Sequence, residues 1–431
     1  MTKEELYRSK FISVDEALDK IKSGDTIATG SYCHEPRELL RSLHTIADRV
    51  ENVTVWSQIP NEDYPFFGMN ELAGKIDMIS LFYGGGLREA HKEQRVSLVP
   101  ANLSAAARVQ VETKKPTVFM AAVTPMDEHG FVRMSCSQQS EQECMEAADL
   151  VIFEANPNIP VLNGTQQIPI EKVDFFVDVD YPAKTIGAIP ITDVERAIAK
   201  NVAPLVNDGD CIQLGIGGMP NAVGEALMTK NDLGIHTEMI TSVMGKLMDA
   251  GVVNNSRKNF NVGKTIGAFA LGDDDLYAYL NNNPMVQIMP ARYVNDPFVI
   301  ARNDNLVSIN TALQIDLTGQ ICSESIGYRQ FSGTGGASDF AYGAYRSKGG
   351  KGIIAISSTA KKGTVSKIQP ILAPGSVVSI SRNIVDYVVT EYGVAKLKNK
   401  SIRERVENLI SVAHPDFRDE LREQAKEMMI W

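Results

Sequence analysis

The sequence predicts an α/β protein built from two tandem, related domains with mostly parallel sheets. Three observations predict this fold. Short apolar segments alternate with helical segments, the chain of 431 residues is too long for one ordinary core, and three segments of the first half recur in order in the second. In parallel sheets ligands bind at the carboxyl ends of the strands, so the functional residues are expected there.

The predicted strands are apolar runs of about four to eight residues, which is the pattern of buried strands in parallel sheets. Such runs occur in ENVTVWS, IDMISLFY, TVFMAAV, DLVIFEA and GIIAIS. Helical stretches such as EPRELLRSLHTIADRV and MPNAVGEALMTK separate them along the chain. This alternation favours layered α/β domains over separate helical and β regions.

The recurring segments indicate an internal duplication. In the first pair, a helix is followed by a turn containing Gly-Asp and by a short strand that ends in glycine, at residues 14–32 and 194–218. The second pair is VTPMDEHGFVRMS and LQIDLTGQICSES, and the third is VDFFVDVDYPA and VDYVVTEYGVA. The boundary is expected near residues 183–193, giving domains 1–188 and 189–431.

Composition and charge exclude several classes of protein. The net charge of -10 argues against nucleic acid as a partner, because a phosphate backbone requires a clustered basic face. No run of about 18 apolar residues is present, so no membrane span is expected. The charged start has no secretory pattern, and the five scattered cysteines favour reduced thiols over a disulfide framework or a zinc site. We therefore expect a cytoplasmic protein.

A glycine-rich turn is the first candidate binding feature. Gly215, Gly217 and Gly218 follow a predicted strand, and Pro220 suits the first turn of a helix. The free N–H groups and the dipole of such a helix favour an anion, for example a pyrophosphate. A structural turn without a ligand is the alternative interpretation.

Glu238 is the candidate catalytic residue. It lies within the predicted strand 235–242, where a carboxylate is costly unless it is paired or used. The alternative is a glutamate on an edge strand that faces water. His236 shares a face with Glu238 because the two are two positions apart. For His236, packing or hydrogen bonding is favoured over a general-base role.

Six motifs give the chain a recognisable identity at the level of family. In order, they are GIGGMPNAV, HTEMI, YVNDP, SINTALQIDLTGQ, SGTGGASDF and VTEYGVA. Together they resemble the acetyl-CoA hydrolase/transferase family of family I CoA-transferases, and most closely its 4-hydroxybutyrate or butyrate CoA-transferase branch. The resemblance covers essentially the whole chain. It implies two linked NagB/RpiA-like domains, a site between them and a homodimer.

The resemblance also implies a reaction and its residues. CoA would pass between a short-chain acyl-CoA and a small carboxylate, through an anhydride and a glutamyl-CoA thioester on Glu238, in fatty acid metabolism. Asn295 and the Gly336 amide would polarise the reacting carbonyl. CoA is a substrate, and no prosthetic group or metal is implied. The CoA contacts would be Gly215, Ile216, Gly217, Gly218, Met219, Leu313, Gly336 and Lys361.

Two other functions stay open at this point. The first is a short-chain acyl-CoA hydrolase on the same fold, and the second is a non-catalytic CoA- or phosphate-binding protein. The first domain is expected to provide the carboxylic acid side of the cleft and the second the CoA loop and Glu238. Capping or solvation is the default for Glu35 and Glu62, and a role in the acid pocket is the alternative for them and for Gly30, Ser31 and Tyr32. Butyrate, 4-hydroxybutyrate, propionate and acetate all fit.

Overall fold

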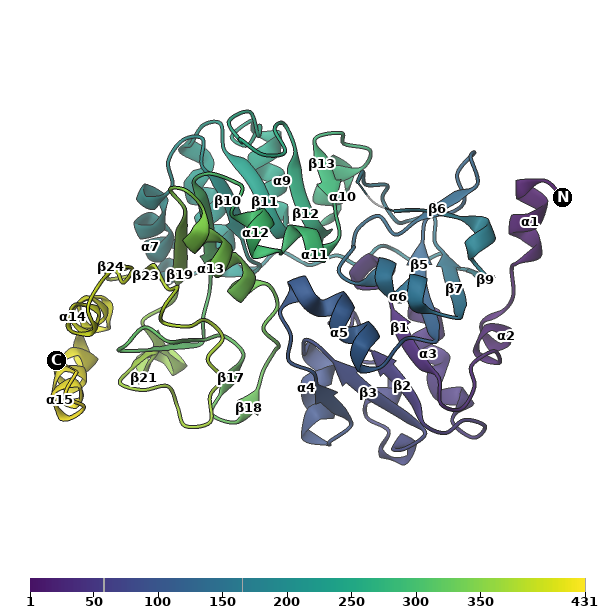
Figure 1. The fold of residues 1–431 in the computed structure, drawn as a ribbon, viewed down its shortest axis with the longest axis horizontal. Helices are drawn as coiled ribbons and strands as arrows, with labels where there is room; N and C mark the ends of the chain where they lie inside the picture. The colour runs from purple at the N-terminus through teal and green to yellow at the C-terminus, as the bar shows by residue number, and fades with distance from the viewer. Residues whose placement is uncertain (57–58, 165, 431) are drawn as a thin grey trace. The chain divides into compact units, whose positions relative to one another are not determined.

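The computed structural model describes residues 1–56, 59–164 and 166–430, which pack into two compact units (Figure 1). The first unit is Met1–Ile186 with Gly267–Tyr293, and the second is Gly187–Ile266 with Val294–Trp431. The predicted division after residue 188 follows sequence similarity, whereas these units follow packing. The Gly267–Tyr293 segment joins the first unit through contacts such as the stacking of Phe269 on Tyr32, whose ring centroids are 4.6 Å apart.

A parallel sheet of seven strands, in the order β4-β3-β2-β1-β5-β7-β9, forms the centre of the first unit. The six residues of β5 are all buried, as expected for a central strand covered on both faces. The strands of Met1–Ile186 are β1 (Thr26–Thr29), β2 (Val53–Trp56), β3 (Ile76–Ser80), β4 (Val96–Leu98), β5 (Val118–Val123), β6 (Phe131–Arg133), β7 (Leu150–Ala155), β8 (Gln167–Pro169) and β9 (Phe175–Asp178).

Short helices connect these strands. They are α1 (Lys3–Ser9), α2 (Val14–Leu18), α3 (Arg37–Ser42), α4 (Gly85–Lys92), α5 (Ala106–Thr113) and α6 (Glu141–Ala147). The helices α1 and α2 both begin with a capping box, in which a threonine or serine side chain and a glutamate three residues on satisfy each other's backbone N–H groups. The later segment contributes most of β12 (Thr265–Ala270), then α10 (Asp274–Leu280), β13 (Val286–Ile288) and most of α11 (Ala291–Val294).

In the second unit, six strands are hydrogen-bonded in the order β11-β10-β14-β19-β23-β24, and only β24 is antiparallel to its neighbour. The strands of the unit, with its small hairpins, are β10 (Cys211–Leu214), β11 (Gly234–Ile240), β14 (Leu306–Asn310), β15 (Gln314–Asp316), β16 (Ile321–Cys322), β17 (Ser325–Ile326), β18 (Arg329–Gln330), β19 (Lys351–Ala355), β20 (Thr359–Ala360), β21 (Val365–Ser366), β22 (Ile368–Gln369), β23 (Tyr387–Thr390) and β24 (Gly393–Lys396).

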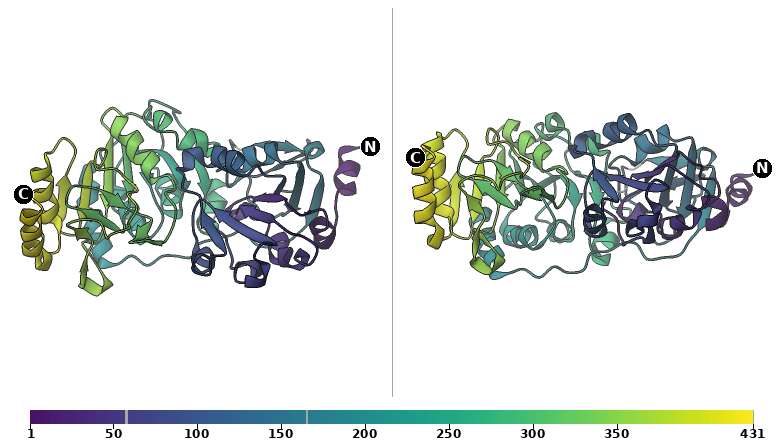
Figure 2. Two further views of the ribbon diagram at one scale, coloured as in Figure 1. Left: turned by 60° about the horizontal axis from the view of Figure 1, so that its bottom comes forward. Right: turned by 90° about the horizontal axis from the view of Figure 1, so that it is seen from below.

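The helices of the second unit are α7 (Asp193–Val202), α8 (Gly218–Ala226), α9 (Ser242–Asp249), α12 (Pro297–Ile300), α13 (Ala337–Arg346), α14 (Ile402–Val412) and α15 (Arg418–Glu427). Figure 2 shows α14 and α15 as a pair of neighbouring helices at the end of the chain, and α14 packs on β24. Their apolar residues, including Leu409 and Leu421, extend a buried cluster beneath β23.

The strand orders confirm the predicted duplication. The order β2-β1-β5-β7-β9 of the first unit has the same connectivity as β11-β10-β14-β19-β23 of the second. The matching turns are also alike in detail. The Asp127 carboxylate accepts backbone bonds from residues 129 and 131, and Asp316 accepts from 318 and 320. Each turn closes on a left-handed glycine, which requires φ > 0. The fold is therefore two related α/β halves, as the sequence predicted.

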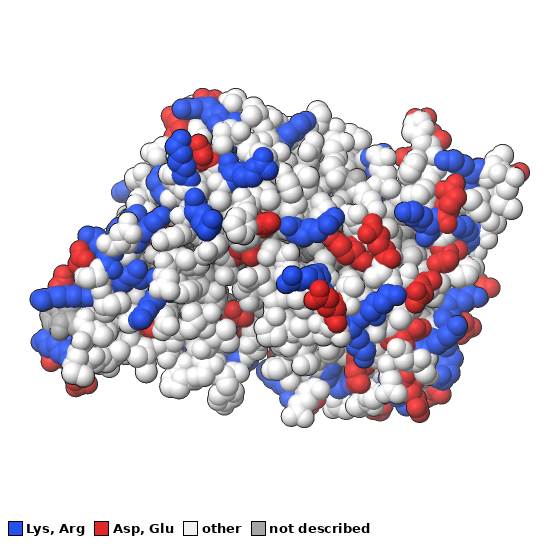
Figure 3. Space-filling view, viewed as in Figure 1, with Lys and Arg blue, Asp and Glu red and all other residues white. Residues whose placement is uncertain are grey.

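Charged side chains of both signs occur on the face of the molecule shown in Figure 3. Basic and acidic side chains are interspersed there over both units. Among the helices of the described residues, none is long and apolar enough to cross a membrane.

Candidate active site

Strand pairing places Glu238 beside the glycine-rich turn. Strands β10 and β11 are parallel, with Cys211 opposite Gly234 and Ile212 opposite Ile235. Farther along, the Thr237 hydroxyl lies 3.5 Å from the Leu214 carbonyl oxygen, the last residue before the turn. Glu238 therefore lies at the carboxyl ends of the strands, where a ligand is expected in this class of sheet.

Two residues that the family resemblance implied for the site lie beside the Glu238 carboxylate. The Asn295 amide donates a hydrogen bond of 2.9 Å to Oε2 of Glu238. Gly336 lies against the same oxygen so closely that a Cβ on Gly336 would be 1.8 Å from Oε2 and 2.2 Å from the Asn295 amide nitrogen. No side chain fits at position 336 without displacing one of these groups. Two of the predicted catalytic residues, Asn295 and Gly336, thus lie against one oxygen of the third, Glu238.

The pKa of Glu238 lies close to neutral pH. Burial raises the pKa of Glu238 and the nearby Asp339 carboxylate adds to the rise, whereas hydrogen bonds from Asn295 and from the Gly336 backbone oppose it, so that the pKa is about 7. Asp339 is buried in the first turn of α13, which begins directly after Gly336. A carboxylate with a pKa in this range is partly ionised at pH 7 and more basic than an ordinary glutamate.

The glycine-rich turn has the backbone that its sequence predicted. Gly217 has φ of +118° and precedes α8, which begins at Gly218, two residues before Pro220. Ile216 remains 43% exposed, although it is a large apolar residue. A Cβ on Gly218 would be 2.5 Å from a carboxylate oxygen of Glu195, so the start of α8 packs closely on α7.

A cavity of about 610 Å³ lies at this edge of the second unit. Two of the predicted CoA contacts, Met219 and Lys361, line it. Leu313 is outside the lining, but the two residues before it are part of the wall. The backbone N–H of Leu313 donates to the Cys322 carbonyl, so this position is fixed by the β15–β16 hairpin.

Three lysines form a cationic wall of the cavity, whose lining also includes one carboxylate, Glu195. Lys361 and the adjacent Lys362 both have left-handed backbone, with φ of +48° and +57°. Lys367 lines the same cavity, and burial lowers its pKa. Spacing on the sequence did not single out Lys367 or the buried Asp339, because only the folded hairpin and the start of α13 bring them to the site.

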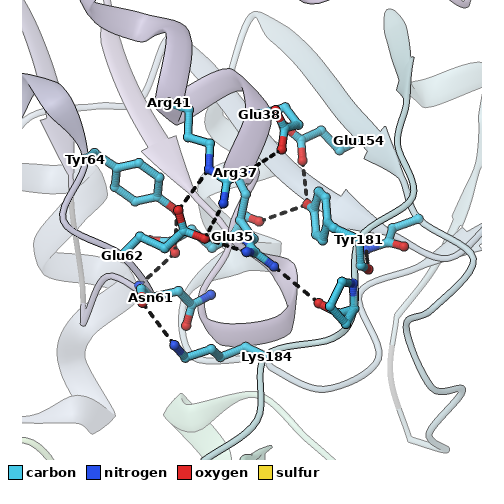
Figure 4. Close-up of polar contacts among 12 residues, drawn as sticks. Glu35, Arg37, Glu38, Arg41, Asn61, Glu62, Tyr64, Glu154, Tyr181 and Lys184 are labelled. Carbon is cyan, nitrogen blue, oxygen red and sulfur yellow. Dashed lines mark hydrogen bonds and ion pairs between the residues drawn. The ribbon is translucent and has the colours of Figure 1, made fainter.

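The acidic residues proposed for the acid pocket form a connected cluster in the first unit (Figure 4). Glu35 is buried, and its side chain neither caps a helix nor faces solvent. Its Oε2 accepts from the Tyr64 hydroxyl at 2.7 Å and from the Asn61 N–H at 2.8 Å. Burial raises the pKa of Glu35 to about 8. Glu35 thus fixes the loop that carries Asn61 and Tyr64.

Glu62 has a different environment. Arg37 and Arg41 both donate to its carboxylate, with nitrogen–oxygen distances between 2.5 and 2.9 Å. These bonds lower the pKa of Glu62 although partial burial opposes them. The same loop is held from another side by Lys184, whose ammonium donates to the Asn61 carbonyl at 3.0 Å (Figure 4).

The remaining candidates are less informative. Tyr32 has φ of +56° and stacks on Phe269, and Gly30 has no room for a Cβ beside the His34 carbonyl. Ser31 is buried at the start of the same turn. All five cysteines are free and buried. In the described part of the chain, no group of three or more His, Cys, Asp or Glu side chains has the arrangement of a metal site.

Two family models together match most of the chain. Residues 1–189 match the acetyl-CoA hydrolase/transferase N-terminal domain, and residues 272–425 match the acetyl-CoA hydrolase/transferase C-terminal domain.

Among similar proteins, succinyl-CoA:cyclohexane-1-carboxylate CoA transferase of Geobacter metallireducens is 43% identical over 99% of this chain and 97% of its own length. The 4-hydroxybutyrate coenzyme A transferase of Clostridium kluyveri is 40% identical over 98% of this chain and 99% of its own. The crystal structure of RipA from Yersinia pestis aligns over the whole of both chains, with a TM-score of 0.94 and 36% identity.

Proposed function

Because the chain belongs to the acetyl-CoA hydrolase/transferase family, we propose that it is a CoA-transferase whose nucleophile is Glu238. Family membership confirms the resemblance that the motifs carry. The observation that supports the catalytic assignment is the convergence of Asn295 and Gly336 on one oxygen of a buried carboxylate whose pKa is raised to about 7.

The reaction begins with the ionised Glu238 carboxylate. It attacks the thioester carbonyl carbon of an acyl-CoA, and collapse of the tetrahedral intermediate breaks the C–S bond, giving an acyl-glutamyl anhydride and the CoA thiolate. The thiolate then attacks the glutamyl carbonyl carbon and releases the first acid as its carboxylate. A second carboxylate reverses both steps and leaves as the new acyl-CoA. Covalent catalysis of this kind gives ping-pong kinetics.

Each tetrahedral intermediate carries an oxyanion that needs fixed donors. The Asn295 amide and the Gly336 N–H are fixed donors at the reacting carboxyl, and removing one donor of this kind typically costs about 10²–10³ in kcat. Because both groups already contact Glu238 in the folded chain, little reorganisation is needed when charge develops.

We propose that CoA binds along the second unit. The cationic wall of Lys361, Lys362 and Lys367 suits the phosphates of CoA, and the turn at Gly215–Met219 lets the ligand approach the backbone. The acids proposed as donor and acceptor are short-chain carboxylates such as butyrate, 4-hydroxybutyrate and acetate. The domain 1–188 would bind the acid. A cytoplasmic location is proposed because all five cysteines are free and buried.

The decisive experiment traps the intermediate. The protein is incubated with butyryl-CoA without an acceptor, reduced with borohydride and mapped by mass spectrometry. We expect a CoA adduct or its reduced alcohol on Glu238 in the wild type and none in Glu238→Ala. The variant Glu225→Ala, which changes an exposed glutamate of α8, serves as the control and should behave as wild type.

A parallel sample with acetate distinguishes the two catalytic functions. Formation of acetyl-CoA as butyryl-CoA disappears supports the transferase. If butyryl-CoA is lost in the sample without acetate, and no acetyl-CoA forms in the sample with acetate, the protein is a hydrolase. Wild-type activity in Glu238→Ala contradicts the assignment of the nucleophile.

A further inference from the structure

His236 is a buried histidine that the proposed reaction does not use. It lies on β11 two residues before Glu238 and is fully buried. Its Nε2 is 2.8 Å from the carbonyl oxygen of Val294. Val294 is the residue immediately before Asn295, whose amide reaches Glu238. The imidazole therefore links the strand of the nucleophile to the backbone that carries the oxyanion donor.

The chemistry of this contact determines the state of the ring. A carbonyl oxygen can only accept, so Nε2 of His236 carries the proton, and in the neutral ring Nδ1 has none. The Nδ1 atom is buried and has no hydrogen-bond partner within the described residues. Burial lowers the pKa of His236 and the nearby Lys258 ammonium adds to this effect, whereas the hydrogen bond to Val294 opposes it, so that the pKa is about 3. His236 thus stays neutral, with its one N–H directed at the Val294 carbonyl.

We propose that His236 is a positioning residue that fixes Asn295 against Glu238. This inference rests on the proposed function, because it gives the position of the Asn295 amide a catalytic meaning. The segment Ala291–Val294 is a helix of a single turn, and a second anchor at its last carbonyl limits rotation of the next peptide. A displacement of a few tenths of an ångström at Asn295 would weaken its 2.9 Å bond to Glu238.

Amide substitutions test this role, because glutamine and asparagine reproduce different ring nitrogens. His236→Gln can place an N–H near the position of Nε2, whereas His236→Asn is shorter and reaches only the position of Nδ1. We expect His236→Gln to keep kcat within about threefold. We expect His236→Asn to lower kcat by about 30- to 100-fold, close to the loss of one oxyanion donor, with KM for butyryl-CoA nearly unchanged.

The pH profile adds a measurement that general loss of packing would not change. The charged or polar groups that affect Glu238 are Asp339, Asn295 and the Gly336 N–H. Because the Asn295 bond favours the ionised carboxylate, its loss should move the acid limb of kcat/KM to higher pH in His236→Asn and not in His236→Gln. The double variant His236→Asn with Asn295→Ala should be no slower than Asn295→Ala alone.

Two kinetic results would overturn the proposal. One is wild-type kcat in His236→Asn, and the other is a double variant whose loss equals the product of the single losses. If His236→Asn does not fold, a measurement on the wild-type protein still tests the proposal. In ¹⁵N-histidine NMR spectra, His236 should show the neutral Nε2–H tautomer from pH 5 to 9, and titration or the Nδ1–H tautomer contradicts the proposal. A wild type without transferase activity but with this tautomer would reject the proposed function alone.

Discussion

At the scale of single residues, buried carboxylates are the most unusual feature of this chain. The pKa values of Glu35, Glu154 and Glu238 are all raised by burial, to between about 7 and about 8. Only Glu238 lies beside the predicted catalytic groups. Glu154 accepts from the Leu39 N–H at the start of α3 and from the Tyr181 hydroxyl, so its role is to hold the local structure. Burial alone therefore does not identify a catalytic acid.

Glu35 permits a test of this structural role through pH. Its pKa is higher in the folded state than the ordinary value of a glutamate. The free energy of unfolding therefore falls as pH rises from about 4.5 to about 8. Glutamine resembles the protonated acid and keeps an acceptor for Tyr64 and Asn61. We expect Glu35→Gln to be more stable than wild type at pH 8.5, by up to about 4–5 kcal/mol, and equally stable near pH 4.5.

The measurement is urea unfolding of both proteins at a series of pH values. Glu62→Gln is the matched control with the opposite sign. The arginines lower the pKa of Glu62, so its contribution to stability is present above the ordinary glutamate pKa and is lost at lower pH. Glu62→Gln should therefore be less stable than wild type at pH 7. A pH-independent difference for Glu35→Gln would contradict the burial of a neutral acid.

At the scale of elements, the turn before α13 determines where Gly336 lies. The carboxylate of Glu324, a buried residue, accepts from the Thr334 hydroxyl, with distances of 3.2 and 3.3 Å to its two oxygens. Its own carbonyl accepts from the N–H groups of Phe331 and Ser332. The turn is thus held by Glu324 at one end and by α13 at the other, and Gly336 lies between them.

Thr334 provides the test of this turn. Thr334→Val keeps the shape of the side chain and removes the hydroxyl, which leaves the buried Glu324 carboxylate with fewer donors. We expect the free energy of unfolding to fall by about 1–3 kcal/mol, and kcat to fall by about tenfold as the donor moves, which is less than the loss of a whole oxyanion donor. Thr334→Ser keeps the hydroxyl and should remain close to wild type. Urea unfolding and steady-state kinetics measure both effects, and equal behaviour of the two variants would show that the hydroxyl does not hold the turn.

At the scale of the whole molecule, the duplication could be predicted from the sequence because it rests on short local sequence patterns. Asp127 and Asp316 begin turns whose bonds lie within four residues, so their signatures are short and recur. The packing of Gly267–Tyr293 with the first unit was not accessible, because it depends on contacts such as Asn282 with Val161 that are distant in sequence. The same limit applies to Asp339, which affects Glu238 only in the folded chain, and to Glu324, whose contact with Thr334 holds the turn before Gly336.

The expected homodimer also belongs to this scale. Several large apolar side chains remain exposed, among them Tyr328 and Ile326 of the β17–β18 hairpin, at 94% and 51%. Exposed apolar groups of this kind favour association. We expect light scattering after size-exclusion chromatography to give twice the 47.2 kDa mass of one chain. A mass of 47.2 kDa at all concentrations would contradict the prediction.

The contact of Asn295 and Gly336 with one oxygen of Glu238 also determines the path of oxygen isotopes. If Oε2 stays with these groups, Oε1 is the atom that bonds to the acyl carbon. The first acid then departs with Oε1, and the incoming acid leaves one of its own oxygens in that place. With acetate labelled with oxygen-18, each complete turnover would exchange Oε1 and preserve Oε2. The folded chain thereby makes two chemically identical oxygens distinguishable.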